Sequence, residues 1–231
     1  MDIVMRNLLI LMLSVVVVSC CGAADKPAIV EAEAAPATAV IYGDTIVLTQ
    51  PDLAAGKTIN EALAARESSR EYSAEPLSLE ELSGVLWAAA GVNRPNGHLT
   101  APSALALYPV TVYAFTADGV FRYNSQLHVL VREAEGDYRE LSAAQDFATA
   151  APLNLVYIAD LGKYDSKFPR DKAEFLSGQD AAGYAENVNL YAAGNGLKAI
   201  TRGSLKGAEV LALLGLDPKQ YVPVLAQTVG K

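Results

Sequence analysis

The segment Ala64-Ala-Arg-Glu-Ser-Ser-Arg-Glu-Tyr72 carries the most informative pattern in this chain of 231 residues. Arg66, Ser68 and Arg70 are spaced by two, and alternate side chains of an extended segment point to the same side. Two guanidinium groups and a hydroxyl can then converge on a compact dianion such as a phosphate monoester. The alternative is a solvated charged turn in which the neighbouring glutamates neutralise the arginines.

The residues on either side of this segment predict helices. Thr58 with Glu61, and Ser78 with Glu81, form capping-box patterns, in which a hydroxyl and a carboxylate satisfy free N–H groups at a helix start. The first helix is expected to reach the first arginine of the segment, and the second to stop at Gly91. The second helix has one apolar face, made of Leu79, Leu82, Val85, Leu86 and Ala89.

The rest of the chain mixes strand-like and helix-like runs. Strands are expected at about 45–48, 110–116, 120–123, 127–132, 153–159 and 221–228. Helices are expected at about 142–150, from Gln179 to Gly194 or Gly196, and at 208–214, while Ala117-Asp-Gly119 predicts a hairpin turn. This order predicts an α+β fold, with a central sheet that is mainly antiparallel and is flanked by helices.

The first 42 residues resemble an export signal followed by a tether. Residues 1–19 combine a basic start with an apolar run that is too short for a comfortable membrane span, which predicts a signal peptide. Val17-Val-Ser-Cys20 resembles the lipobox of bacterial lipoproteins, so Cys20 is expected to carry a lipid anchor. The alternative is ordinary cleavage near Ala23. Residues 20–42 are expected to be a flexible tether, and residues 43–231 the folded domain.

Composition excludes several classes of function. Both cysteines, Cys20 and Cys21, precede the folded domain, which removes disulfides, a thiolate nucleophile and cysteine-ligated metals. The formal net charge of -8, with no basic run, argues against a nucleic-acid partner. The two histidines, His98 and His128, have no metal-ligand spacing, so no metal site is expected.

Four segments in order carry a resemblance to a known family. They are residues 64–72, Pro76-Leu-Ser-Leu-Glu-Glu-Leu82, Leu86-Trp-Ala-Ala-Ala-Gly-Val-Asn93 and Ala101-Pro-Ser-Ala-Leu-Ala-Leu-Tyr-Pro109. The chain resembles the nitroreductase superfamily, and within it the branch of the thiazoline and oxazoline dehydrogenases and their stand-alone relatives. The similarity continues through residues 183–190, 196–197, 201–203 and 213–216, and so covers roughly residues 45 to 230.

The resemblance implies a homodimer that holds two FMN molecules at the subunit interface. Arg66, Ser68 and Arg70 match the residues that bind the FMN phosphate in the family. Glu67 stands where many relatives have a second basic residue. A further segment, which lies along the flavin ring in relatives, corresponds to Pro102, Ser103, Ala104 and Leu105; relatives in this branch usually have glycine at the position of Leu105.

The resemblance also assigns the residues near the reactive edge of the flavin. Thr201, Arg202 and Gly203 match a segment whose backbone N–H contacts the ring nitrogen that accepts hydride. The alternative for Arg202 is an exposed charge after a strand. Many relatives also reach the phosphate with basic residues of a C-terminal tail, and here only Lys231 could take that role.

These features predict an FMN-dependent oxidoreductase that transfers hydride between the flavin and a small organic substrate or electron donor. An alternative is a flavin-binding or degenerate lipoprotein without turnover. Azoline oxidation in peptides is a third hypothesis, and Lys163-Tyr164 resembles a catalytic pair of those enzymes. Asn187 is expected at the dimer interface. Export to the cell envelope or periplasm, away from cytoplasmic NADH and NADPH, implies another electron donor or an external substrate.

Overall fold

The computed structural model describes residues 40–231, with side chains described from residue 43 onward. The expected signal peptide (1–19), the lipidation site Cys20 and most of the expected tether lie outside the described residues. The last three residues of that tether, Val40–Tyr42, form strand β1. The sheet therefore begins three residues before the predicted domain start.

A single sheet of eight strands forms the centre of the domain, in the order β1-β2-β5-β4-β3-β6-β8-β7. All neighbouring strands are antiparallel. After β1, the strands are β2 (Thr45–Val47), β3 (Val110–Thr116), β4 (Gly119–Asn124), β5 (Val129–Glu135), β6 (Leu153–Asp160), β7 (Lys198–Arg202) and β8 (Tyr221–Gly230). The last strand in the order, β7, is an edge strand.

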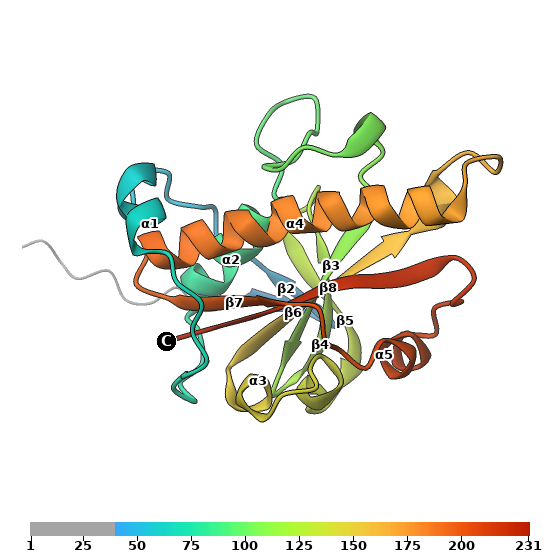
Figure 1. The fold of residues 1–231 in the computed structure, drawn as a ribbon. Coiled ribbons are helices and arrows are strands. Elements are labelled where there is room, and N and C mark those ends of the chain that lie inside the picture. Colours follow the sequence, from blue (N-terminus) through green and yellow to red (C-terminus); the bar gives the residue numbers. More distant parts are fainter. Residues whose placement is uncertain (1–39) are drawn as a thin grey trace, which may run out of the picture. The chain divides into compact units, whose positions relative to one another are not determined.

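Helices cover the sheet on both faces (Figure 1). On one face lie α1 (Ile59–Ala65), α2 (Leu79–Ala90) and the long α4 (Arg170–Gly194), and on the other lie α3 (Asp146–Ala150) and α5 (Gly207–Leu214). Three short 3-10 helices, η1 (Ala104–Ala106), η2 (Arg139–Leu141) and η3 (Leu161–Lys163), lie in the connections. No helix in the described range has the length and apolarity needed to cross a membrane.

Two hydrophobic cores follow from the alternation of side chains along the strands. Leu155 and Tyr157 of β6 face α2 and α4, where they pack with residues such as Leu86 and Val188. The alternate residues of β6, Val156 and Ile158, face α5, where they share a cluster with Val210. The strand β6 is buried on both faces, as its continuous apolar run predicts.

Local signals predicted several elements well. Both capping boxes are confirmed, at Thr58 with Glu61 and at Ser78 with Glu81, and Gly91 is the C-cap of α2. The mainly antiparallel sheet flanked by helices is also confirmed.

Other elements differ from the prediction. The helix α4 begins at Arg170, nine residues before the expected Gln179. The sequence did not predict this start because residues 170–178 are polar on most sides and lack an apolar stripe. Of the helix expected at 142–150, only the short α3 (Asp146–Ala150) forms, and η2 (Arg139–Leu141) precedes it. The segment 198–204, to which the sequence assigned no element, contains β7.

Candidate flavin site

The segment that carries the two arginines is extended and lies against the edge strand β7. Helix α1 ends at Ala65, and the backbone of its C-cap residue, Arg66, is already in the extended region. Ser68 forms a parallel bridge with Ala199 of β7, and the Ser69 N–H donates to the Ala199 carbonyl over 3.1 Å. Farther on, the Ser73 N–H donates to the carbonyl of Lys231 over 2.8 Å. Backbone hydrogen bonds therefore fix this segment at both ends.

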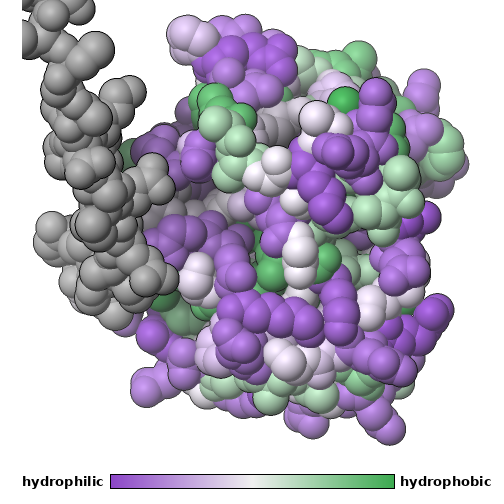
Figure 2. All heavy atoms as spheres, turned by 90° about the vertical axis from the view of Figure 1, so that its left-hand side faces the viewer, coloured by the Kyte–Doolittle hydropathy of each residue, from purple (hydrophilic) through white to green (hydrophobic). Residues whose placement is uncertain are grey.

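The side chains of Arg66, Ser68 and Arg70 are all exposed. Within residues 40–231, neither guanidinium has a hydrogen bond or an ion pair, so Glu67 and Glu71 do not neutralise them as a charged turn would require. Unpartnered guanidinium groups beside a hydroxyl are suited to a phosphate, which both arginines can approach with charge-assisted hydrogen bonds. The face that carries α1 and the C-terminal end of α4 mixes hydrophilic and hydrophobic areas (Figure 2).

The C-terminal residue Lys231 has other partners. Its ammonium nitrogen lies 2.6 Å from Glu75 Oε1 and 3.2 Å from Glu81 Oε2. The hydrogen bond to Glu75 and the charges of both glutamates raise the pKa of Lys231. This lysine is therefore engaged, rather than free to replace the basic tail that contacts the phosphate in relatives.

Thr201 lies on the free edge of the sheet. Residues of an antiparallel strand direct their N–H and C=O groups alternately to the two neighbouring strands. Because the Ala199 carbonyl points outward to Ser69, the backbone groups of Thr201, two residues later, also point outward. The Thr201 side chain is exposed as well. The N–H of Thr201 is thus placed to donate to a ligand at this edge.

Arg202 is buried, with 5% of its surface exposed, so the alternative of an exposed charge is wrong. Its Nε donates to Thr228 Oγ1 over 2.9 Å, and its Nη2 donates to Asn154 Oδ1 over 2.9 Å. Its Nη1 donates to the carbonyls of Ser142 and Ser204 over 2.9 and 3.1 Å. The side chain is fully used in the fold, so only the backbone of Arg202 could contact a cofactor.

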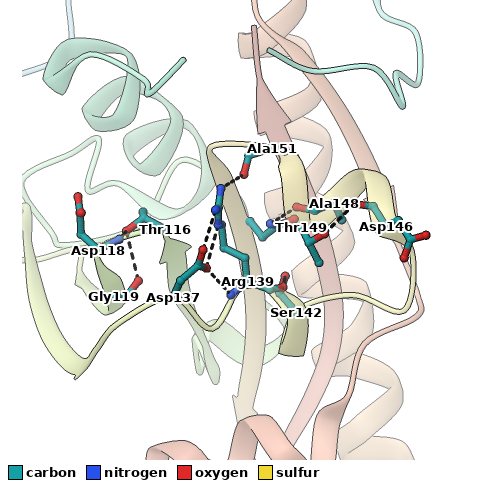
Figure 3. Close-up of polar contacts among 11 residues, drawn as sticks. Thr116, Asp118, Gly119, Asp137, Arg139, Ser142, Asp146, Ala148, Thr149 and Ala151 are labelled. Carbon is teal, nitrogen blue, oxygen red and sulfur yellow. Dashed lines mark hydrogen bonds and ion pairs between the residues drawn. The ribbon is translucent and has the colours of Figure 1, made fainter. Parts of the chain in front are cut away.

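The turn that contains Ser142, an acceptor for Arg202, is fixed by a second arginine, Arg139 (Figure 3). The Arg139 guanidinium donates to both carboxylate oxygens of Asp137 and to the carbonyl of Ala151, over 2.7 to 2.9 Å. The Ser142 hydroxyl donates to the Arg139 carbonyl over 2.6 Å. The carbonyl of Ser142 is thereby held in place as an acceptor for Arg202.

A buried carboxylate anchors the segment that was expected along the flavin ring. Asp180 of α4 is 6% exposed and accepts hydrogen bonds from Ser103 Oγ over 2.5 Å and from the Ala104 N–H over 3.0 Å. Ser103 Oγ also accepts from the N–H of Tyr108 over 2.8 Å. No local sequence signal links Asp180 to this segment, because the two are 77 residues apart in the chain.

The same segment holds an unusual backbone. Leu105, Ala106 and Tyr108 have φ angles of 57°, 54° and 47°, in the left-handed region that favours glycine. The usual glycine of relatives at the position of Leu105 agrees with this conformation. Leu105 is 70% exposed. Strained, exposed backbone of this kind often marks a ligand site.

Lys163 and Tyr164 are both engaged in the fold. The Lys163 ammonium donates to the Tyr108 carbonyl over 2.6 Å and helps to fix the strained segment. Tyr164 is 6% exposed, and its hydroxyl lies 3.1 Å from Ser177 Oγ. The tyrosine hydroxyl is therefore not presented to a substrate, which removes the support for an azoline-oxidising pair.

The two halves of the expected site lie on opposite sides of α4. Asp180 binds the 103–104 segment, and Asn189, nine residues later, donates to Thr201 Oγ1 over 3.1 Å. At 3.6 residues per turn, nine residues rotate the side-chain direction by about 180° and advance it by roughly 14 Å. Figure 1 agrees, since the connection between α2 and β3 rises above α4 while β7 lies below it.

An apolar hollow of about 460 Å³ lies where α1, α2 and α4 meet. Leu53 and Ile59, which are 78% and 61% exposed, line it, as do Trp87 and Asn187. Leu63 of α1 is 55% exposed as well. Large exposed apolar side chains that gather in one area are typical of an interaction surface.

Comparisons with known proteins place the chain among relatives of the same fold. A model of the nitroreductase family matches residues 63–231. A protein of Methanocaldococcus jannaschii assigned to the nitroreductases is 33% identical over 199 residues, which cover 82% of this chain and 98% of that protein. A solved structure from Ralstonia eutropha JMP134, also assigned to the nitroreductases, is 36% identical with a TM-score of 0.76, and the match covers 86% of this chain and 94% of that one.

A more distant structure from Desulfovibrio desulfuricans, solved in complex with FMN, shares the fold. It is 22% identical with a TM-score of 0.54, over 75% of this chain and 86% of that one. With the family model and the two nearer relatives, the assignment is clear. The chain belongs to the nitroreductase family.

Proposed function

We propose that this protein is an FMN-dependent oxidoreductase that exchanges a hydride between the flavin and a small organic substrate. The observation that carries the proposal is the pair of exposed guanidinium groups of Arg66 and Arg70, which have no hydrogen bond or ion pair within residues 40–231. Backbone hydrogen bonds fix their segment beside the free edge of β7. Membership of the nitroreductase family supports a flavin as the cofactor.

The described residues fit two parts of FMN, its phosphate and the reactive edge of its ring. Arg66, Ser68 and Arg70 would hold the phosphate, and the outward N–H of Thr201 would donate to the reactive edge of the ring. The flavin, when bound, supplies the two-electron chemistry: a substrate that gives up a hydride is oxidised by two electrons, and the acceptor that later receives it is reduced by two. The protein supplies binding, orientation and hydrogen bonds.

A second copy of the chain would complete the site. Because residues 102–105 and Thr201 lie on opposite sides of α4, one flavin cannot rest on both segments of one chain. We infer a homodimer in which the 102–105 segment of one protomer approaches the flavin held by Arg66 and Arg70 of the other. The exposed apolar residues around α1 supply a surface for that contact.

The alternative is a flavin-binding or degenerate family member without turnover. Lys231 is engaged by Glu75 and Glu81, and Glu67 adds a negative charge between the two phosphate-binding arginines. Both features weaken the hold on the phosphate. They bear on cofactor affinity, whereas the reactive edge at Thr201 is unaffected by them.

Anaerobic mixing of the FMN-loaded protein with a hydride donor, followed by a quinone or nitroaromatic acceptor, distinguishes these functions. The visible flavin band is expected to bleach with the donor and to return with the acceptor. NADH and NADPH are suitable probes for the purified protein. FMN that binds but is not reduced by any hydride donor would favour a flavin-binding protein without turnover. Failure to bind FMN would reject the oxidoreductase and favour a degenerate family member.

We also propose that the protein is exported and anchored at Cys20, on the basis of the lipobox-like Val17-Val-Ser-Cys20. NADH and NADPH are cytoplasmic metabolites, so an exported enzyme would draw electrons from another donor or oxidise an external substrate. Fractionation of cells tests the anchor. The full chain is expected in the membrane fraction and Cys20→Ala in the soluble fraction, and equal partitioning of the two would argue against lipidation.

A further inference from the structure

Two separate polar networks hold the edge strand β7, one on each face of the sheet. Arg202 faces the α5 side, where its guanidinium is bonded to Asn154 and Thr228. Thr201 faces the α4 side, where it accepts a hydrogen bond from Asn189. Hydrogen bonds therefore fix side chains of the edge strand β7 on both faces of the sheet.

In the network on the α4 side, the donor and acceptor of each hydrogen bond can be assigned, starting from the backbone carbonyl of Ala185. The Ala185 carbonyl can only accept, so the side-chain atom of Gln227 that lies 2.9 Å away is its nitrogen. The oxygen of Gln227 therefore faces Tyr157, whose hydroxyl donates to it over 2.6 Å. Gln227 and Tyr157 are completely buried, so water does not replace these partners.

The orientation of the Gln227 amide also determines the orientation of the Asn189 amide. The second hydrogen of the Gln227 nitrogen is donated to Asn189 Oδ1 over 2.7 Å. The nitrogen of Asn189 must then lie at the other end of its amide, where it donates to Thr201 Oγ1 over 3.1 Å and to Glu186 Oε2 over 2.9 Å. The orientation of the Asn189 amide is thus set by the buried end of the chain of hydrogen bonds.

The hydroxyl of Thr201 accepts from Asn189, so its own hydrogen points elsewhere. Within the described part of the chain, no acceptor for that hydrogen is present, and the side chain is exposed. The N–H of the same residue points outward at the free edge of β7. Thr201 therefore offers two hydrogen-bond donors, one from the backbone and one from the side chain.

We propose that the Thr201 hydroxyl is a second donor to the reactive edge of the flavin, and that Gln227 and Asn189 are positioning residues that keep it a donor. This inference rests on the proposed function. The ring nitrogen that accepts hydride and the neighbouring carbonyl oxygen are adjacent acceptors, which a paired N–H and O–H can satisfy together. On reduction the carbonyl oxygen gains electron density, whereas the ring nitrogen takes up the hydride and no longer accepts. A hydroxyl that donates to the carbonyl oxygen therefore favours the reduced flavin.

The first test is the midpoint potential of bound FMN in Thr201→Val, which keeps the shape of the side chain but removes the hydroxyl. Loss of one hydrogen bond is expected to weaken the affinity for reduced flavin about tenfold relative to oxidised flavin. For a two-electron couple this corresponds to a potential about 30 mV more negative. Thr201→Ser keeps a hydroxyl and is expected to retain the potential of the unmodified protein.

The second test reverses the direction of the network. Asn189→Asp replaces the donating nitrogen with an acceptor oxygen, so the Thr201 hydroxyl would donate to the new carboxylate instead of the flavin. The potential is expected to fall as in Thr201→Val. The added negative charge also lowers the potential by itself. Asn189→Asp introduced into the Thr201→Val protein, which has no hydroxyl to redirect, measures this charge effect alone. The fall in potential that Asn189→Asp causes in the unmodified protein is expected to be clearly larger.

The possible results separate failure of FMN binding from failure of the Thr201 hydroxyl as a donor. If the unmodified protein binds no FMN, the proposed function fails and this inference falls with it. If FMN binds but Thr201→Val leaves the potential unchanged, the hydroxyl is not a donor to the ring and only this inference fails. Equal effects of Asn189→Asp in both backgrounds would also overturn the positioning role.

Discussion

The guanidinium of Arg202 carries a charge into the interior, and no carboxylate forms an ion pair with it within residues 40–231. Burial lowers its pKa to about 10, so it remains protonated at neutral pH. Burial of an unpaired charge is costly unless hydrogen bonds compensate, and here four neutral acceptors surround it. Sequence alone could not predict this role, because three of the four acceptors, on Thr228, Ser142 and Asn154, lie 26, 60 and 48 residues away in the chain.

His128 is a second buried ionisable residue, with 9% of its surface exposed. Its Nδ1 lies 2.8 Å from the Tyr123 hydroxyl, and its Nε2 lies 2.8 Å from the Thr49 carbonyl. The carbonyl can only accept, so Nε2 carries the hydrogen and Nδ1 accepts from the tyrosine. The ring is therefore held in its neutral form, and burial lowers its pKa below 6.5.

This arrangement makes the stability of the domain depend on pH. Since the pKa is lower in the folded state, the unfolded state binds the proton more tightly. The free energy of unfolding is then expected to fall as the pH drops below about 6.5, by up to about 1.4 kcal/mol per pH unit. Denaturant unfolding between pH 8 and pH 5 measures the slope.

The matched variants are His128→Asn and His98→Asn. Asparagine tolerates the left-handed backbone of His128, whose φ is 52°, and does not titrate. His128→Asn is expected to reduce the slope, and His98→Asn in the 93–99 loop to leave it largely unchanged. An equal slope in the unmodified protein and in His128→Asn would show that His128 is not responsible.

Among the elements, the connection between α2 and β3 differs most from ordinary loop structure. Asp180 and Lys163 fix it by hydrogen bonds to Ser103 and to the Tyr108 carbonyl. Three of its non-glycine residues have positive φ angles, each of which costs about 1 to 2 kcal/mol. The fold keeps this conformation because α4 and η3 hold it.

Leu105→Gly tests the strain directly. The leucine side chain is 70% exposed, so its removal forfeits little buried area. Glycine relieves the left-handed strain, and the free energy of unfolding is expected to rise by about 0.5 to 1 kcal/mol. Leu107→Gly is the control, because its φ of -81° suits any residue, and there glycine is expected to destabilise by about 1 kcal/mol. Equal destabilisation by both changes would refute the strain.

The accuracy of the sequence-based predictions varied with the range of the interactions involved. Capping boxes and the stop at Gly91 depend on residues a few positions apart, and these were confirmed. The start of α4 was missed because its first turns are stabilised without an apolar stripe. The anchors Asp180 and Gln227 were missed because their partners are 77 and 38 residues away. The donor spacing at Arg66, Ser68 and Arg70 is local, so it could be recognised.

For the whole molecule, the proposed homodimer would make cofactor binding depend on dimerisation, because the site is divided across α4. Ile59→Asp together with Leu53→Asp places charges on the apolar surface around α1. Aspartate is compatible with the first turn of a helix, so α1 is expected to persist. Sedimentation is expected to show a monomer that has lost bound FMN.

Leu127→Asp is the matched control for that experiment. Leu127 is 70% exposed in the turn between β4 and β5. This variant is expected to remain dimeric and to keep its cofactor. An unmodified protein that is monomeric and still binds one FMN per chain would contradict the shared site.

The central claim is that Arg66 and Arg70 hold the phosphate of FMN. The visible absorption spectrum of the purified protein, with the released cofactor identified by mass, measures this most directly. Arg170→Ala is the control, since Arg170 is an exposed arginine at the other end of α4. The unmodified chain and the control are expected to be yellow and to carry FMN, and Arg66→Ala and Arg70→Ala are expected to lose the flavin. Colourless protein that does not take up added FMN, or full occupancy in both arginine variants, would contradict that claim.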